Sequence, residues 1–308
     1  MLFVQSLGVP RSARTRGSLL GQSTCACRGA RTFAARVAVA RTGQELRRGT
    51  VVCSASAGNS KSVVKGSSVV VVLGASRGLG KELVRRLSAD GTFTVHAVSR
   101  SACDEFVQDP ELRHQLDARN PEQMHELVAK TRPDVIVNCV APAESDGVDE
   151  YPAYSYAVTS QCVDACLGVK SQGKTPLFLL VSALGAGDSE NSIPSQVKDN
   201  MRGMLLDKSR AEKHLRTKYG DDFVIVRPAP LVDEDATGSG ILTESVNAYG
   251  AITRGDLAEL LCQILNASES ARGKILTAVD GTKVLHVSPY IRNYEFWEKL
   301  PFAAFELA

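Results

Sequence analysis

The stretch that decides the fold is residues 69–87, VVVVLGASRGLGKELVRRL. Its first five residues are all apolar, as in a strand that is buried on both faces of a sheet. A turn with three glycines follows, at Gly74, Gly78 and Gly80, and apolar residues then recur with the spacing of an amphipathic helix. We therefore predict a buried strand, a glycine-rich turn and a helix in immediate succession.

The predicted turn has the properties of a phosphate-binding site. A helix that begins directly after glycines presents free backbone N–H groups and the positive end of its dipole, and both attract phosphate. Glycines also let phosphate approach the backbone closely, because they carry no Cβ. The spacing is G-x-x-x-G-x-G rather than the more familiar G-x-G-x-x-G of dinucleotide-binding proteins. We expect a dinucleotide to be held by all seven residues of the turn, which are Gly74, Ala75, Ser76, Arg77, Gly78, Leu79 and Gly80.

The rest of the chain alternates apolar strands with amphipathic helices. Strand patterns occur at residues 92–98, 112–117, 134–140, 177–181, 223–226 and 274–279. Helical patterns occur at residues 121–131, 151–169, 202–218 and 255–265. This alternation predicts an α/β fold, with a doubly wound parallel sheet, helices on both faces and right-handed crossovers. In such sheets, ligands bind at the carboxyl ends of the strands.

The first 53 residues differ in composition from the rest, with nine Arg, no Lys and one acidic residue. An Arg-rich, Ser-rich and acid-poor N-terminus is typical of an organelle transit peptide. Residues 51–55, VVCSA, look like a plastid processing site, and a mitochondrial address is the alternative. We predict a transit peptide over 1–55, a flexible leader over 56–67, a dinucleotide-binding domain over 68–281 and a C-terminal tail over 282–308.

The net charge of the chain after residue 53 limits the classes of partner that we expect it to bind. This part of the chain contains 27 Lys and Arg and 33 Asp and Glu, which gives a net charge of −6. This balance argues against broad electrostatic binding to nucleic acid, although a basic N-terminal arm is an alternative interpretation of the first residues. No apolar run reaches the roughly 18 residues of a membrane span, so no transmembrane segment is expected. The five cysteines after residue 53 lack the spacing of a zinc site, and we expect no metal and mostly buried thiols.

The glycine turn resembles that of the short-chain dehydrogenase/reductase superfamily, and further motifs resemble its extended and atypical members, of NmrA-like and plastid type. The motifs are VSALGAGD at 181–188, KSRAE at 208–212, RP at 227–228 and TRGDLA at 253–258. Together the matches span about residues 68–280. The resemblance implies a Rossmann fold that binds NAD(P) and an oxidoreductase activity.

The resemblance also implies cofactor-binding residues at the strand ends. NAD-preferring members place an acidic residue after the second strand, but this chain has Arg100 there. With Arg77 it is expected to grip the 2′-phosphate of NADP(H), so NAD(H) is the less expected cofactor. Asp117 matches the acid that lies near the adenine, and Asn138 begins the segment that passes the cofactor ribose. The alternatives are two solvated arginines, a cap for Asp117 and an ordinary turn residue for Asn138.

The catalytic residues match the family only in part. Lys208 matches the lysine that binds the nicotinamide ribose and lowers the pKa of a tyrosine four residues earlier. Here that earlier residue is Met204, so the proton-donating tyrosine is missing. Ser182 is the obvious hydroxyl, yet many extended members place it one residue later, at Ala183. A tyrosine within residues 151–156 is an alternative donor, while Tyr219 is expected to pack in the core.

Two functions follow from this combination. The first is an NADP(H)-dependent oxidoreductase of the plastid stroma that passes hydride to an unidentified small organic substrate. Its substrate pocket is expected from residues 189–202 and 229–251, and the second of these segments is expected to include a mobile lid. The second function is a non-catalytic NADP(H)-binding redox sensor or plastid complex assembly factor, with a plastid protein as its partner. RNA binding by the same fold is a third interpretation, which the acidic charge disfavours.

Overall fold

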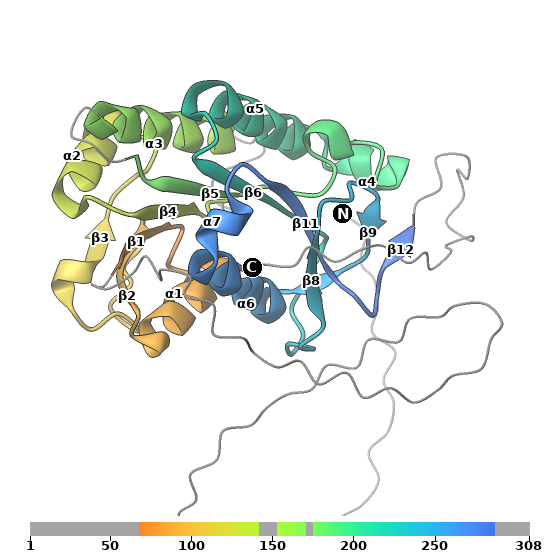
Figure 1. Cartoon of the computed structure of the whole chain (residues 1–308), viewed down its shortest axis with the longest axis horizontal. Coiled ribbons are helices and arrows are strands. Elements are labelled where there is room, and N and C mark those ends of the chain that lie inside the picture. Colours follow the sequence, from red (N-terminus) through yellow and green to blue (C-terminus); the bar gives the residue numbers. More distant parts are fainter. Residues whose placement is uncertain (1–67, 142–152, 171–174, 287–308) are drawn as a thin grey trace, which may run out of the picture. The chain divides into compact units, whose positions relative to one another are not determined.

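The computed structural model describes residues 68–141, 153–170 and 175–286, which Figure 1 draws as a coloured ribbon. All of them belong to one compact unit, residues 60–308. The predicted transit peptide, the predicted leader and all but the first five residues of the predicted tail lie outside the described residues.

An eight-stranded sheet runs through the fold in the order β3-β2-β1-β4-β5-β6-β11-β8. Because β2 and β3 lie to one side of β1 while β4 lies to the other, the chain changes direction across the sheet between β1 and β4, as in a doubly wound fold. The strands are β1 (Ser68–Leu73), β2 (Phe93–Ser99), β3 (Arg113–Gln115), β4 (Val135–Asn138), β5 (Leu177–Val181), β6 (Phe223–Pro228), β8 (Gly240–Thr243) and β11 (Ile275–Asp280).

The edge strand β8 departs from the predicted all-parallel sheet, because it pairs antiparallel with β11. The other seven strands run parallel to one another, so the α/β prediction is confirmed with one added strand. An antiparallel strand at the edge of an otherwise parallel sheet is common, since it needs no helical crossover.

Helices cover both faces of the sheet, as predicted (Figure 1). One apolar core lies under α1 (Gly78–Asp90) and α6 (Arg254–Asn266). The other lies under α2 (Pro121–Thr131), α3 (Tyr154–Lys170) and α5 (Arg202–Tyr219). In the described part of the chain, no helix is both long and apolar enough to cross a membrane.

Short elements make up much of the rest of the described chain. Two of them form small pairs, β7 parallel to β10 and β9 antiparallel to β12. The remaining bounds are η1 (Pro110–Leu112), η4 (Gly187–Ser189), α4 (Ser195–Asn200), β7 (Leu231–Val232), β9 (Ala248–Tyr249), β10 (Ile252–Thr253), α7 (Ser268–Ala271) and β12 (Leu285–His286).

Local side-chain hydrogen bonds explain where two of the elements begin or end. The helix α2 begins where the Asn120 side chain accepts a hydrogen bond from Gln123 N at 3.0 Å and Pro121 supplies the first helical residue. The strand β4 ends two residues before its predicted end, because the Asn138 side chain accepts a bond from Val140 N at 3.0 Å and starts a turn.

The cysteines largely follow the prediction of buried thiols. Cys103, Cys162 and Cys166 are buried, and Cys139 and Cys262 are half-buried. Burial raises the pKa of the Cys166 thiol to about 12 and that of Cys262 to about 11, which keeps both thiols protonated and unreactive at neutral pH. Within the described residues, no group of three or more potential metal ligands comes together.

Candidate functional site

A cleft of 1060 Å³ lies at the carboxyl ends of the central strands. Residues that directly follow β1, β2, β4, β5 and β6 line it, as the fold predicts. The glycine turn forms one wall, the end of β2 forms a second, and residues from α4 and α5 close the far side. A cleft of this volume is ample for a dinucleotide.

The backbone of the glycine turn explains why glycines stand at these positions. Gly74 and Gly78 have φ angles of +81° and +53°, in the left-handed region that favours glycine. A Cβ on Gly80 would lie 2.2 Å from the carbonyl oxygen of Gly74, so the third position admits no side chain. The N–H groups of Gly74 and Ala75 both donate to Val98 O, at 2.9 and 3.0 Å, which fastens the turn to the end of β2.

Five of the seven residues predicted to hold the dinucleotide line the cleft, and two do not. Ala75 is fully buried and Gly80 packs against the turn, so these two shape the turn from behind. The five that line the cleft are Gly74, Ser76, Arg77, Gly78 and Leu79. The helix α1 begins at Gly78, with its N-terminal N–H groups at the turn.

A basic and aromatic corner occupies the end of the cleft at β2. Arg100 lies at the predicted place, and its guanidinium carbon is 5.6 Å from the centre of the Tyr154 ring. The guanidinium carbon of Arg119 is 4.9 Å from the same ring. Arg119 and Asp117 form an ion pair at 2.8 Å, and the hydrogen bond from Arg119 lowers the pKa of the Asp117 carboxyl in spite of partial burial.

Asp117 lies at the cleft and also acts as a turn cap, while its nearness to the adenine stays a prediction. It lines the cleft, and its carboxylate also caps a turn by accepting a bond from Arg119 N at 2.9 Å. Neither Arg119 nor its contact with Tyr154 was predicted, because the sequence does not show that the start of α3 reaches this corner.

Lys208 lies at the floor of the cleft, between the ends of β4 and β5. Its ammonium donates to Val181 O at 2.9 Å and to Val140 O at 3.4 Å, and the side chain is almost wholly buried. Burial lowers the pKa of Lys208, an effect that the neighbouring Asp207 carboxylate opposes. Met204 lines the cleft one helical turn earlier, at the place of the missing tyrosine.

Asn138 lies beneath the floor rather than in it. Its side chain is 2% exposed, donates to Thr159 Oγ1 at 3.3 Å and accepts from Val140 N. The residue does not line the cleft, so it shapes the turn at residues 138–140, whose last two residues do.

Ser182 also lines the cleft, but its hydroxyl is already engaged. Its Oγ donates to Glu212 Oε1 at 2.5 Å, and Glu212 accepts two bonds from Arg227, at 3.0 Å from Nε and 2.6 Å from Nη2. Glu212 and Arg227 are buried, and Arg227 also pairs with the exposed Asp188. Burial alone would lower the pKa of Arg227, but these carboxylates hold it above its usual value.

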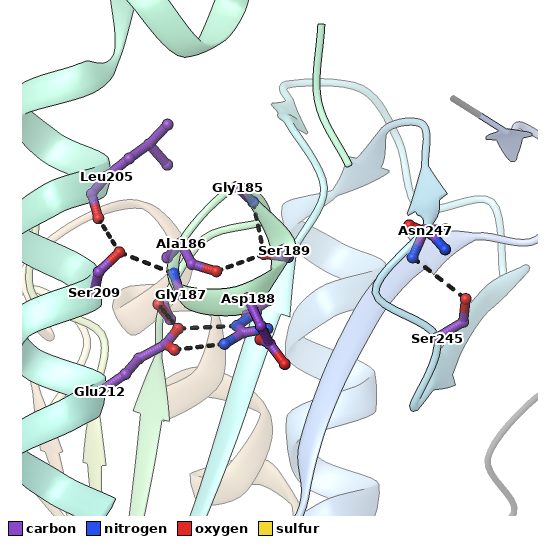
Figure 2. A network of polar contacts seen from close by, with 12 residues as sticks. Gly185, Ala186, Gly187, Asp188, Ser189, Leu205, Ser209, Glu212, Ser245 and Asn247 are labelled. Atoms are coloured by element: carbon purple, nitrogen blue, oxygen red, sulfur yellow. Dashed lines mark hydrogen bonds and ion pairs between the residues drawn. The ribbon is translucent and has the colours of Figure 1, made fainter. Parts of the chain in front are cut away.

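The loop after β5 is built around this buried ion pair. Figure 2 shows Glu212 beside the 185–189 turn, with two dashed contacts. A Cβ on Gly187 would lie 2.5 Å from Arg227 Nη2, and Gly187 N donates to Ser209 Oγ at 2.8 Å. The family-like motifs at 181–188, 208–212 and 227–228 therefore meet in one scaffold, which the sequence had marked only as separate matches.

An apolar compartment adjoins Lys208. Both segments expected to form a substrate pocket contribute to it. The first supplies three lining residues and the second four, which are Ile193, Val197, Met201, Ala229, Pro230, Leu231 and Asp233. Its apolar side chains are Leu184, Ile193, Val197, Met201, Met204 and Leu231.

The segment predicted to be a mobile lid is fastened to the start of α6. The Asp256 carboxylate accepts hydrogen bonds from Thr237 N at 2.9 Å and Gly238 N at 2.8 Å, and β7 pairs with β10. Gly238, one of the residues that suggested mobility, thus donates its N–H to a carboxylate of α6, and the mobility of the segment stays a prediction.

The tyrosines of the described residues offer no donor at the expected place. Tyr219 packs on Phe178 and its hydroxyl donates to Pro176 O at 2.9 Å, as expected for a core residue. Tyr156 packs edge-on against His214, and Tyr151 lies outside the described residues. Tyr154 lines the cleft, in the corner with Arg100.

Comparison with known proteins agrees with this geometry. A family model described as NAD(P)H-binding matches residues 74–268. No curated protein matches the sequence.

Solved structures share the fold at low sequence identity. The anaerobillin reductase ChuY of Escherichia coli O157:H7 is 22% identical, with a TM-score of 0.57 over 69% of this chain and 97% of that one. The oxidoreductase YlbE of Lactococcus lactis is 21% identical, with a TM-score of 0.56 over 70% and 92%. A wide-type short-chain dehydrogenase/reductase of Veillonella parvula, solved with NADP, is 12% identical, with a TM-score of 0.52 over 69% and 94%.

Proposed function

Because the chain belongs to the NAD(P)H-binding family, we propose that it is an NADP(H)-dependent oxidoreductase of atypical short-chain type. One observation carries the proposal: a single cleft joins the glycine turn, Lys208 and an apolar compartment. A module that only binds a nucleotide needs the first of these, whereas hydride transfer needs a place for a second molecule beside the nicotinamide. The arginine-rich N-terminus supports a plastid location, with the mitochondrion as the alternative.

The residues of the cleft suit the two ends of NADP(H). The backbone N–H groups at the start of α1 face the place of the pyrophosphate, and Arg77 and Arg100 line the cleft where a 2′-phosphate would lie. Asp117, the acidic residue in that corner, is paired with Arg119, which leaves it a poor acceptor for ribose hydroxyls. This arrangement favours NADP(H) over NAD(H).

In the proposed reaction, residues of the chain would orient the cofactor and determine where the proton comes from. The cofactor supplies a hydride at its nicotinamide ring. Lys208, fixed by two carbonyl oxygens, would bind the ribose hydroxyls and so orient that ring toward the apolar compartment. Met204 has no proton to give, and Tyr154 lies in the corner with Arg100, so we assign the proton to water that enters the cleft. These features favour an apolar, conjugated substrate, in which the negative charge that follows hydride addition is delocalised.

Turnover of NADPH by the full chain with a panel of apolar conjugated carbonyl compounds tests the proposal. Anaerobillin belongs in the panel, since a structural neighbour is named as its reductase. We expect NADPH oxidation with at least one compound and loss of that rate in Lys208→Met. Lys198→Met is the matched control, because Lys198 is paired with Glu190 away from the cleft floor. Equal rates in both variants would contradict the role of Lys208.

A second candidate function is a redox sensor or plastid assembly factor that binds NADP(H) without turning it over. The specific observations in its favour are Met204 in place of a proton donor and a Ser182 hydroxyl already bound to Glu212. Under this function NADPH binds, the panel gives no turnover, and a plastid protein is recovered with the chain in a complex that depends on the NADPH to NADP⁺ ratio. Turnover that Lys208→Met abolishes would exclude it.

A further inference from the structure

Arg254 is a basic residue of the cleft whose place no local sequence pattern reveals. It is the first residue of α6 and lines the cleft beside the glycine turn. A Cβ built on Gly78 would lie 3.7 Å from Arg254 Nε and 4.0 Å from its Cδ. The side chain therefore passes directly over the first residue of α1.

This position is electrostatically costly unless an anion shares it. Arg254 stands at the N-terminus of its own helix and beside the N-terminus of α1, and the helix dipole disfavours a cation at each of these two N-termini. Arg77, at the N-cap position of α1, adds a second positive charge to the same wall of the cleft. A bound negative group would offset these unfavourable interactions, so the position of the Arg254 guanidinium points to an anion-binding role.

The structure supplies one such negative group from within the chain. Asp233, which directly follows β7, forms an ion pair with Arg254 and also lines the cleft. The Asp233 side chain is 85% exposed, so the contact is open to water and easily exchanged. Asp256, the other acid at the start of α6, is occupied by Thr237, Gly238 and Thr253.

We infer that Arg254 is a ligand of the cofactor pyrophosphate, and that Asp233 occupies its guanidinium until the pyrophosphate displaces it. The inference rests on the proposed NADP(H) binding and adds two residues to it. A diphosphate carries more charge than one carboxylate and also receives the N–H groups of α1, so it wins the exchange. Asp233 thus competes with the cofactor for the Arg254 guanidinium and pairs with it again when the cofactor leaves.

Two cofactors that differ only in the 2′-phosphate distinguish this role from that of Arg100. The pyrophosphate is common to NADPH and NADH, so Arg254→Gln should weaken both by about tenfold or more, the size expected for a charged hydrogen bond. Arg254→Lys should fall between wild type and Arg254→Gln, because an ammonium cannot bind bidentately. Arg86→Gln is the matched control, since Arg86 pairs with Glu82 and Glu259 on the same helix pair, outside the cleft lining.

The sign of the Asp233→Asn effect tests the competition. If Asp233 is a competitor, Asp233→Asn tightens the binding of both cofactors about twofold to tenfold, and has no effect in the Arg254→Gln background. Dissociation constants are measured by cofactor fluorescence on the full chain, with circular dichroism to check folding.

Two results would overturn the inference: wild-type affinity in Arg254→Gln, or an Asp233→Asn variant that binds as weakly as Arg254→Gln, which would make Asp233 a mere support. If Arg254→Gln does not fold, Arg254→Lys and Asp233→Asn decide the question. Failure of the wild-type chain to bind either cofactor would instead refute the proposed function.

Discussion

Gly80→Ala is the sharpest perturbation of the glycine turn. The new Cβ would lie 2.2 Å from Gly74 O and 2.8 Å from Gly74 C, both of them backbone atoms that cannot rotate away. Ordinary contact begins near 3.4 Å, so α1 and the turn must move apart by about 1 Å. Overpacking of this kind costs about 1–3 kcal/mol, and we expect a value near the top of that range because the obstacle is backbone.

The same movement should reach the cofactor. The turn is held by two bonds to Val98 O, and a shift of α1 away from Gly74 misaligns the N–H groups that would bind the pyrophosphate. We expect at least a tenfold loss of affinity for NADPH and for NADH alike, on the order of 1.4 kcal/mol.

Gly203→Ala is the control, because it places the same methyl group in a helix, α5, where nothing lies within 4 Å. There the change should be neutral or stabilise the chain by up to about 1 kcal/mol. Urea unfolding gives the stability of each variant and fluorescence titration its affinity. A Gly80→Ala variant with wild-type stability and wild-type affinity would refute the reasoning.

Two further predictions concern stability. Arg227→Met should destabilise the chain by about 3–5 kcal/mol, because Glu212 is left buried without its partner, and the added change Glu212→Gln should restore part of the loss in urea unfolding. Burial, then the positive charges of His96 and Lys130, lower the pKa of His114 from 6.5 to about 4. The unfolded chain therefore binds this proton more readily, so stability falls as the pH drops from about 6.5 to about 4. His114→Asn should reduce that fall by about 1 kcal/mol, a value discounted for solvent screening. Unfolding curves at pH 7 and pH 4 measure it, and an identical fall in the variant would contradict the assignment.

The elements were predictable where one local signal dominates. The strand at 177–181 and the helix at 121–131 have the predicted bounds, because an unbroken apolar run and an Asn-Pro start leave no competing structure. The segment between β6 and α6 was not predictable in detail. Its strands have two to four residues, and their pairing depends on partners distant in sequence, such as β11 for β8.

The site residues were predictable where their position next to a predicted strand or helix was enough to place them at the cleft. The glycine turn, Arg100 and Lys208 were found from position relative to a strand or a helix, and all of them lie at the cleft. The role of Arg254 was not predictable, because its nearness to Gly78 comes from the packing of α6 on α1, which no local pattern encodes. In the same way, Ser182 looks free in the sequence and is bound in the structure.

The measurement that tests the central claim most directly is the binding of NADPH and NADH to the full chain and to its Arg100→Ala variant. We predict saturable binding of one NADPH per chain, tighter than that of NADH, and a loss of about tenfold or more for NADPH alone in the variant. Absence of saturable binding by either cofactor would contradict the assignment of the cleft. An equal loss for both cofactors would contradict the placing of the 2′-phosphate at Arg100.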